Sequence, residues 1–174
     1  MAVGLSAGFF EPLESTGIML IEVAAKMIGE VLPLHDRAAM AGAARNFNAV
    51  MRGRFERIID FLKLHYCISR RRDTAYWRDT TSSETLPQSL ADKLAQWRHR
   101  PLSRFDFIVD LETFLPPSWQ YILYGMDFAV SLPEGSPDDA RRAEAAFARV
   151  HQAGAEAVKH LPDHRSLVAR YHTP

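Results

Sequence analysis

The sequence predicts a mainly α-helical protein with six or seven helices, and three observations support that prediction. Apolar residues recur at steps of three and four through a long segment, residues 36–69. The run Ser-Pro-Asp-Asp at 136–139 has the cap, the first-position proline and the first-turn acids of a helix start. The sequence lacks the Gly-x-Gly-x-x-Gly pattern of a dinucleotide-binding fold. At 174 residues the chain fits one helical region, residues 1–174, with a buried core.

The composition argues against nucleic-acid, membrane and metal functions. Basic and acidic residues balance at 21 each, so no net field draws the chain to nucleic acid or an acidic membrane, and the basic run at 70–72 reads as a solvated face. The single cysteine, Cys67, excludes an internal disulfide, and no His, Cys, Asp or Glu cluster has metal-ligand spacing. No apolar run reaches the ~20 residues of a membrane span and no basic leader precedes the apolar start, so we expect a soluble, cytoplasmic protein.

The chain starts with ten small and apolar residues, 1–10, which we expect to form a buried strand end or loop. Soon after, Ser15 or Thr16 is a natural N-cap, because its hydroxyl can accept a hydrogen bond from the first helical turn. The helix that follows, residues 16–32, is apolar on most faces. That pattern indicates a central helix covered by other elements.

The start of this helix is suited to a small anion. The open amides around Thr16 and Gly17 lie at the positive end of the helix dipole, and Gly17 has no side chain to keep a ligand away from the backbone. Glu14 stands just outside, held by the same turn. The alternative is that these residues only mark a helix start, since such caps are common.

The second helix, expected over residues 36–69, carries one continuous apolar stripe. Its residues are Phe47, Met51, Phe55, Ile58, Leu62 and Tyr66. Near its end, His65 reads as a capping or packing residue more readily than as a catalytic one.

Shorter helices follow. Asp73 is expected to cap one that runs through Trp77, and Pro87 to open another that ends near His99. A further short helix spans residues 117–125. Its Trp119 and Tyr124 either line a flat aromatic pocket that suits an indole or pack in the core, and both alternatives stay open.

The last helices are an amphipathic one, from the cap at Ser136 to about His160, and a short one over residues 162–170. The amphipathic helix is expected to turn four apolar side chains inward. These are Phe147, Val150, Val158 and Leu161.

Three sequence blocks resemble the tryptophan halogenase family of flavin-dependent enzymes. The run Gly-Phe-Phe-Glu-Pro-Leu-Glu-Ser-Thr-Gly-Ile at 8–18 looks like the family's Gly-Phe-x-Glu-Pro-Leu-Glu-Ser-Thr signature. Asp-Phe-Leu-Lys-Leu-His-Tyr at 60–66 and Arg-Asp-Thr-Ala-Tyr-Trp at 72–77 resemble its next two blocks in order. The resemblance covers residues 1–80, and more loosely 119–125 and the tail from Leu161. The family's dinucleotide motif and catalytic lysine lie N-terminal to these blocks, so the chain resembles the helical C-terminal portion of such an enzyme.

The resemblance implies an aromatic halogenation that uses reduced FAD, dioxygen, and chloride or bromide. In this family the halide is oxidised to hypohalous acid, which then substitutes an aromatic ring. By motif position Glu14 matches the catalytic glutamate, and Thr16 and Gly17 match the halide-binding backbone. The positions that match the flavin-facing segment, residues 1–17 and the start of the next helix, are Leu5, Ser15 and Ile18.

The resemblance also implies partners. They are an aromatic small molecule, either tryptophan or another indole or aromatic ring, and a separate flavin reductase that supplies the reduced FAD. A homodimer is a further expected partner state, because apolar surface exposed around residues 1–20 would favour self-association. Trp119 and Tyr124 are the candidates for substrate recognition. Because the lysine and the dinucleotide motif have no counterpart in this sequence, we expect the chain alone to be inactive. The same reasoning predicts exposed apolar surface around residues 1–20.

Two alternatives stay open. One is a non-catalytic helical interaction domain, in which the Glu-Ser-Thr run is only a helix start. The other is part of a flavin monooxygenase that does not halogenate.

Overall fold

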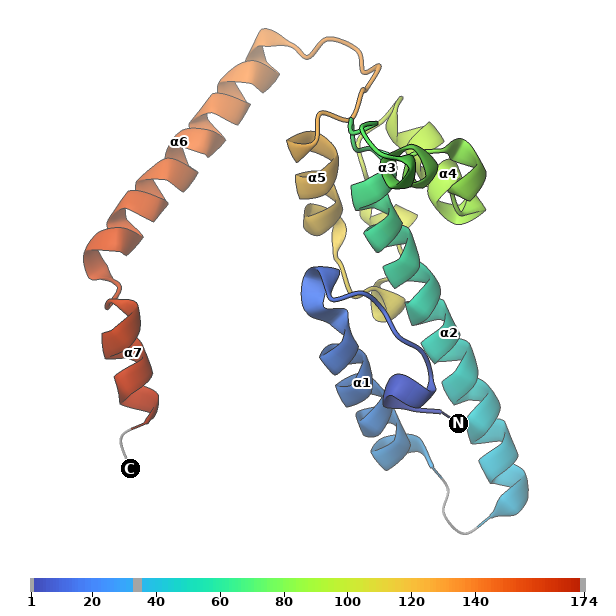
Figure 1. Cartoon of the computed structure of the whole chain (residues 1–174). Coiled ribbons are helices and arrows are strands. Elements are labelled where there is room, and N and C mark those ends of the chain that lie inside the picture. The colour runs from blue at the N-terminus through green and yellow to red at the C-terminus, as the bar shows by residue number, and fades with distance from the viewer. Residues whose placement is uncertain (1, 33–35, 173–174) are drawn as a thin grey trace. The chain divides into compact units, whose positions relative to one another are not determined.

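The computed structural model of the chain describes residues 2–32 and 36–172. This part of the chain consists of seven α-helices with five short 3₁₀ turns and contains no strand, which confirms the mainly α prediction (Figure 1). The helices are α1 (Thr16–Val31), α2 (Arg37–Cys67), α3 (Ala75–Thr80), α4 (Gln88–Trp97), α5 (Pro116–Gly125), α6 (Pro137–His160) and α7 (His164–Tyr171). The 3₁₀ turns are η1 (Gly4–Ser6), η2 (Leu13–Ser15), η3 (Ser83–Thr85), η4 (Arg104–Asp106) and η5 (Val109–Leu111).

The described elements group into two units, an N-terminal unit that ends at Leu132 and a C-terminal unit that starts at Pro133. The N-terminal unit holds α1 to α5, and the C-terminal unit holds α6 and α7. The expectation of one helical region over residues 1–174 stays a prediction.

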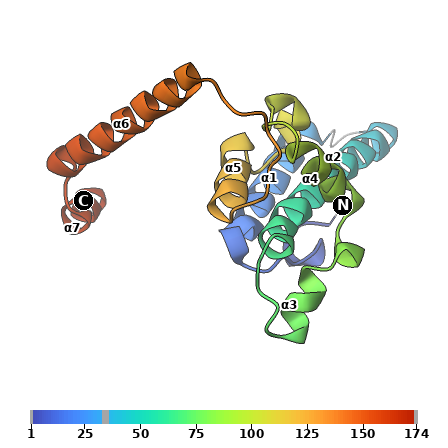
Figure 2. The same ribbon diagram turned by 90° about the horizontal axis from the view of Figure 1, so that it is seen from above.

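Helix α2 organises the N-terminal unit, because α1, α3, α4, α5 and η5 all contact it. Viewed from above, α4 lies close to α2, whereas α3 projects at the margin of the unit (Figure 2). The apolar stripe expected on α2 is present: Phe47, Met51, Ile58 and Leu62 are buried and Phe55 packs against them. The 3.6-residue period of the stripe explains why one long helix can bury a single face along its length.

Two apolar clusters form the core of this unit. The first, between α1 and α2, is built around Leu20, Ala24 and Ile58. The second joins α2, α4 and α5 through aromatic rings: Phe61 contacts Trp119 at a centroid distance of 5.0 Å, and Trp119 contacts Trp97 at 5.5 Å. These edge-on ring contacts add to the stabilisation that burial of the ring area provides.

Charged side chains also cross between these elements. Asp60 of α2, nearly buried, accepts hydrogen bonds at 2.7 Å from Ser89 Oγ and from Lys93 Nζ of α4. Arg57 pairs at 2.9 Å with Glu112, whose burial raises the pKa of its carboxyl while the Arg57 charge opposes that rise. Because an unpaired buried charge is costly, these pairs fix where α4 and η5 meet α2.

The first helix is less covered than the sequence predicts. Thr16, Leu20 and Ala24 are buried, but Ile18 and Ile21 are exposed. Within the described part of the N-terminal unit, α2 is the helix that packs most extensively against α1, and a large part of the α1 surface stays exposed. The expectation of a fully covered central helix is therefore wrong for this part of the chain.

The segment before α1 is not the buried strand end or loop predicted for residues 1–10. It forms the η1 turn and crosses the α1–α2 pair (Figure 1), with Gly4 next to Ile21 and Gly8 next to Phe55. Two of its larger side chains are exposed, Leu5 by 80% and Phe9 by 77%, whereas Phe10 packs against Phe55 of α2. The predicted exposed apolar surface at the start of the chain is thus present.

The observed N-caps of α3 and α6 can be compared with the caps predicted from the sequence. Thr74, not Asp73, caps α3, since its hydroxyl accepts the Trp77 amide while Asp73 pairs with Arg71. At α6 the predicted cap is confirmed: Ser136 and Asp139 satisfy each other's main-chain amides in a capping box.

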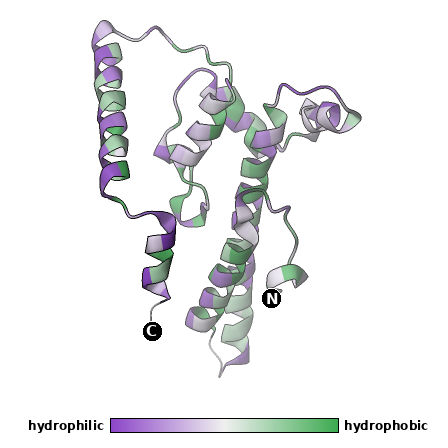
Figure 3. Ribbon diagram, turned by 60° about the vertical axis from the view of Figure 1, so that its left-hand side comes forward, coloured by the Kyte–Doolittle hydropathy of each residue, from purple (hydrophilic) through white to green (hydrophobic). Residues whose placement is uncertain are grey.

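The four side chains expected to point inward from α6 are exposed instead. Hydrophobic and hydrophilic residues are interspersed along this helix (Figure 3), and the apolar ones recur at helical spacing, so it is amphipathic as predicted. However, α7 is the only other helix of the C-terminal unit, and it leaves the apolar face of α6 uncovered. The exposed residues are Phe147, Val150, Val158 and Leu161.

Two absences hold for the part of the chain that the structure describes. None of its helices combines the length and the apolar character needed to cross a bilayer. No three or more His, Cys, Asp or Glu side chains within it are grouped so as to hold a metal ion.

Candidate functional site

The turn that precedes α1 has an unusual backbone. Glu14 has φ 63° and Ser15 has φ 52°, so two consecutive residues other than glycine are left-handed. The left-handed conformation costs a residue with a side chain about 1–2 kcal/mol. The turn is closed by the Ser15 amide, which donates to the Pro12 carbonyl at 3.0 Å. Such strain persists where the surrounding structure enforces it, and it is concentrated at functional sites.

The same backbone creates a concave set of main-chain donors. Ser15 is left-handed and Thr16 right-handed (φ −71°, ψ −18°), an alternation that turns successive amides toward one point and favours an anion. Ser15 occupies the N-cap position, but its side chain makes no cap hydrogen bond and the Thr16 hydroxyl has no partner among the described residues. The expectation that the hydroxyl of Ser15 or Thr16 caps the helix is therefore wrong. The amides of Thr16 and Gly17 belong to the first turn, where no intrahelical partner exists.

Thr16 and Gly17 add two features to this site. The Thr16 side chain is 3% exposed, and its Oγ1 is buried without a hydrogen-bond partner among the described residues. A Cβ built on Gly17 would meet no atom within 4 Å, so the space beside its amide is open. An unpaired buried hydroxyl is costly, and a bound anion next to it would satisfy its O–H.

Glu14 lies at the other end of this turn, next to His65 from the last turn of α2. Glu14 Oε1 is 3.2 Å from His65 Nε2, and His65 Nδ1 is 2.8 Å from the Phe61 carbonyl oxygen. The imidazole is largely buried and stands edge-on to the Phe61 ring, with centroids 4.9 Å apart. The Glu14 side chain is 38% exposed, so one side of the carboxylate is held and the rest is accessible.

Tyr66, the residue after His65, makes a second contact with the segment that precedes α1. Tyr66 hydrogen-bonds with Glu11, and the Tyr66 ring also contacts Tyr76 and Trp77. Burial raises the pKa of the Tyr66 hydroxyl well above its usual value, and Glu11 raises it further. Tyr66 is therefore a neutral donor to the Glu11 carboxylate.

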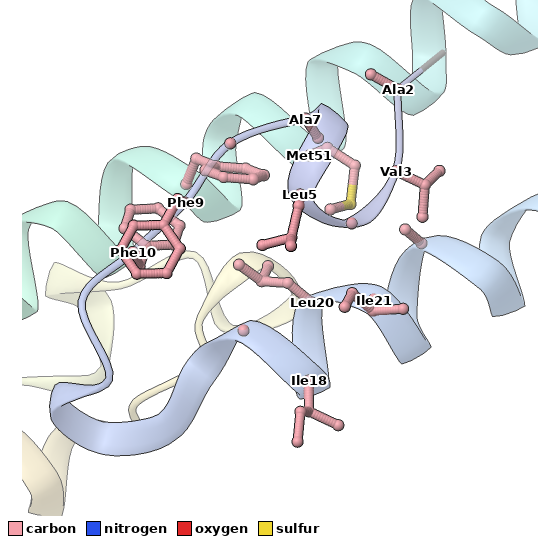
Figure 4. Close-up of a pocket in the computed structure, with 15 residues that line it drawn as sticks. Ala2, Val3, Leu5, Ala7, Phe9, Phe10, Ile18, Leu20, Ile21 and Met51 are labelled. Atoms are coloured by element: carbon pink, nitrogen blue, oxygen red, sulfur yellow. The ribbon is translucent and has the colours of Figure 1, made fainter.

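An apolar pocket opens beside the donors, between the N-terminal segment and α1. Figure 4 shows Leu5 pointing from the segment toward Leu20 of α1. The cavity volume is about 300 Å³. The structure thus brings Leu5, Gly17 and Ile18 to one pocket, whereas Ser15 is not among its lining residues.

A comparison with protein families assigns the chain. The family model described as "Tryptophan halogenase" matches residues 1–137. The chain belongs to the tryptophan halogenase family. The match includes α1 to α5 and the whole Glu14–Gly17 turn, so the predicted family resemblance is confirmed.

Comparison with individual halogenases shows what share of their length this chain covers. It is 33% identical over 174 residues to the 7-chloro-L-tryptophan 6-halogenase KtzR of Kutzneria sp., covering 98% of this chain and 33% of the relative. The crystal structure of a tryptophan halogenase from Shewanella frigidimarina superposes with a TM-score of 0.86 at 38% identity, covering all of this chain and 34% of that one. Tar14, a tryptophan C-6 flavin-dependent halogenase, gives a TM-score of 0.81 at 30% identity over 96% of this chain and 33% of its own. The chain therefore spans about a third of the length of these relatives.

The two halogenase substrate candidates lie in different environments. Trp119 has no exposed surface, and its indole N–H donates to the Phe114 carbonyl at 3.1 Å. It packs in the core, so the alternative of a substrate-lining Trp119 is wrong for this structure. Tyr124 is 46% exposed on α5 and lines a shallow hollow with Tyr121.

The sequence analysis interpreted His65 as a capping or packing residue and did not predict its contact with Glu14, which the structure shows. A histidine in a helical apolar pattern carries no signal of its own. The only sequence signal was its position within the Asp-Phe-Leu-Lys-Leu-His-Tyr block, which resembles a block of the halogenase family.

Proposed function

We propose that this chain supplies the halide-binding and proton-accepting groups of a flavin-dependent halogenase that acts on an aromatic small molecule. The observation that carries the proposal is the left-handed pair Glu14–Ser15, which sets a carboxylate beside the open amides of Thr16 and Gly17. A helix start needs no such strain, since an ordinary N-cap residue is extended. Membership of the tryptophan halogenase family supports the same chemistry.

The proposed halide, chloride or bromide, binds at the Thr16 and Gly17 amides. The buried, unpartnered Thr16 hydroxyl and the open space at Gly17 fit an anion of this size. The N-terminal end of a 16-residue helix adds a favourable field.

The reduced FAD would lie along the apolar pocket, against Leu5 and Ile18. Both side chains are largely exposed and line one cavity, which fits a flat aromatic ring system. Ser15 is part of the same turn but is not among the residues that line the pocket. When bound, reduced flavin supplies the electrons that reduce dioxygen and thereby convert halide into an electrophilic oxidant. The chain's own residues then hold the halide and exclude water from the pocket.

Glu14 acts on the substrate side. As the carbon–halogen bond forms on the aromatic ring, the ring becomes cationic. The C–H bond then breaks, its electron pair returns to the ring, and the proton passes to the Glu14 carboxylate. A positioned carboxylate that accepts this proton contributes about 10²–10⁴-fold in rate.

The substrate is an aromatic small molecule, tryptophan or another indole or aromatic ring, and Tyr124 is the proposed recognition residue on this chain. The other proposed partners are a flavin reductase and a second copy of the protein. Because the relatives are three times as long, we propose that halogenation requires the remaining part of such an enzyme and that this chain alone is inactive. The proposed location is the cytoplasm.

A chimera tests this function. Residues 1–174 replace the matching third of the Shewanella frigidimarina halogenase, and this protein is called the halogenase chimera below. With a flavin reductase, FAD and chloride or bromide, it is expected to halogenate a tryptophan or indole substrate, detected by mass spectrometry. A folded, FAD-binding chimera that makes no halogenated product while the parent enzyme does would contradict the proposal.

A further inference from the structure

The His65 imidazole makes two polar contacts whose hydrogen positions can be worked out. The Phe61 carbonyl oxygen, 2.8 Å from Nδ1, can only accept, so Nδ1 carries a proton. The second nitrogen, Nε2, faces Glu14 Oε1 at 3.2 Å. A carboxylate also only accepts, so that contact requires one further proton, either on Nε2 or on Glu14.

The geometry thus places one proton between the Glu14 carboxyl and the His65 ring, and its location decides which side chain donates. The other ionisable groups at this corner are already engaged: Glu11 and Tyr66 bond each other, and the Lys63 ammonium donates to Thr80 O and Thr85 Oγ1 at 2.8 Å each.

We infer that His65 is a positioning residue, which donates from Nε2 to Glu14 Oε1 and leaves Oε2 to accept the substrate proton. This inference rests on the proposed function of Glu14. Glu14 needs such a partner because it sits on a strained left-handed turn rather than on a rigid helix. The imidazole is suited to the role, since the Phe61 carbonyl and the Phe61 ring fix its orientation.

The first test uses the chain itself and requires no enzymatic activity. Nitrogen NMR of the ¹⁵N-labelled protein at neutral pH reports which ring nitrogens carry protons, and the His65 signals are assigned by their loss in His65→Gln. In the wild type both His65 nitrogens are expected to be protonated. In Glu14→Gln the side-chain amide can donate to Nε2, so Nε2 is expected to lose its proton while Nδ1 keeps it. Unchanged His65 signals in Glu14→Gln would overturn the inference.

The second test uses conservative variants of the halogenase chimera. His65→Gln places an amide N–H near the position of Nε2 and keeps a donor to Glu14. His65→Asn places its amide near Nδ1 and keeps only the Phe61 bond. The matched control is His99→Gln, at an exposed histidine of the same unit.

His65→Asn is expected to lower kcat for halogenation by about 10- to 100-fold, the range typical of losing an orienting partner, with KM and flavin reoxidation unchanged. His65→Gln is expected to stay within about 3-fold of the wild type, as is His99→Gln. Circular dichroism confirms that each variant is folded. A folded His65→Asn with wild-type kcat, or a His65→Gln that loses as much as His65→Asn, would overturn the inference. An inactive wild-type chimera would count against the proposed function, and the NMR measurement would still decide the role of His65.

Discussion

Glu14 Oε1 and His65 Nε2 lie 3.2 Å apart although the two residues are separated by 51 positions in the chain. One belongs to the strained turn before α1 and the other to the last turn of α2. Their contact, with that of Glu11 and Tyr66, ties the turn to α2, the helix that the other elements of the N-terminal unit contact. The carboxylate and the open amides of Thr16 and Gly17 are therefore held on one rigid support, as a site for oriented chemistry requires.

The substitution Gly17→Ala is expected to change two properties in opposite directions: it stabilises the fold and weakens halide binding. Space is open at Gly17, so alanine is expected to raise the free energy of unfolding by roughly 0.5–1 kcal/mol through helix propensity. The added methyl group stands beside the proposed halide amide, so the halogenase chimera is expected to need a higher halide concentration. Denaturant unfolding and the halide dependence of product formation measure the two effects.

Gly29→Ala is the matched control, since Gly29 lies on the same helix α1 and an added Cβ there also meets no atom within 4 Å. It is expected to stabilise the protein similarly and to leave the halide dependence unchanged. Equal halide dependence in both variants would remove Gly17 from the site.

Trp119→Ala and Tyr124→Ala distinguish core from surface. Trp119 is fully buried, so its truncation is expected to cost about 3–5 kcal/mol of unfolding free energy. Tyr124→Ala is expected to change stability by no more than about 0.5 kcal/mol and to raise KM for the aromatic substrate in the halogenase chimera. Urea denaturation and steady-state kinetics check these outcomes. A Trp119→Ala protein of unchanged stability would contradict the packing described above.

Stability at low pH depends on Asp106. Hydrogen bonds from Arg100 hold the pKa of this carboxyl well below its usual range, and the Ser103 amide and the Trp97 indole contribute. A depressed folded-state pKa means that its stabilisation is complete above the ordinary value near 4 and is lost as pH falls below it. Asp106→Asn is expected to destabilise the protein at pH 6 and to flatten the loss of stability between about pH 4 and 2. Thermal melts across this range test it, with the exposed Asp92→Asn as control.

FAD binding by the isolated chain is expected to be weak or absent. The described residues offer an apolar pocket for the ring system, but the sequence contains no Gly-x-Gly-x-x-Gly turn to hold the pyrophosphate. Fluorescence titration of FAD measures this directly. Micromolar or tighter binding would contradict the expectation.

Local signals made much of this fold predictable. The Ser-Pro-Asp-Asp run fixed the start of α6, and the 3.6-residue stripe predicted α2, because both depend on neighbouring residues in the chain. Exposure of Phe147 on α6 and of Ile18 on α1 was not predictable, since periodicity shows which face is apolar and not whether another element covers it.

The helix start predicted an anion site at Thr16 and Gly17, and the motif resemblance supplied the role of Glu14, but the geometry of the turn was not predictable. Glu14 and Ser15 are left-handed without being glycine, a conformation that propensity disfavours and only tertiary contacts enforce. The contact of His65 with Glu14 depends on how the turn packs on α2, which no local pattern contains.

The measurement that bears most directly on this account is Glu14→Gln in the halogenase chimera, with product formation and flavin reoxidation followed in parallel. If Glu14 accepts the ring proton, halogenation slows by two or more orders of magnitude, about 2.7 kcal/mol or more, while flavin reoxidation continues at the wild-type rate. If Glu14 only marks a helix start, neither rate changes and stability falls by about 0.3–1 kcal/mol. Unchanged product formation, or an equal loss of both rates, would contradict the role assigned to Glu14.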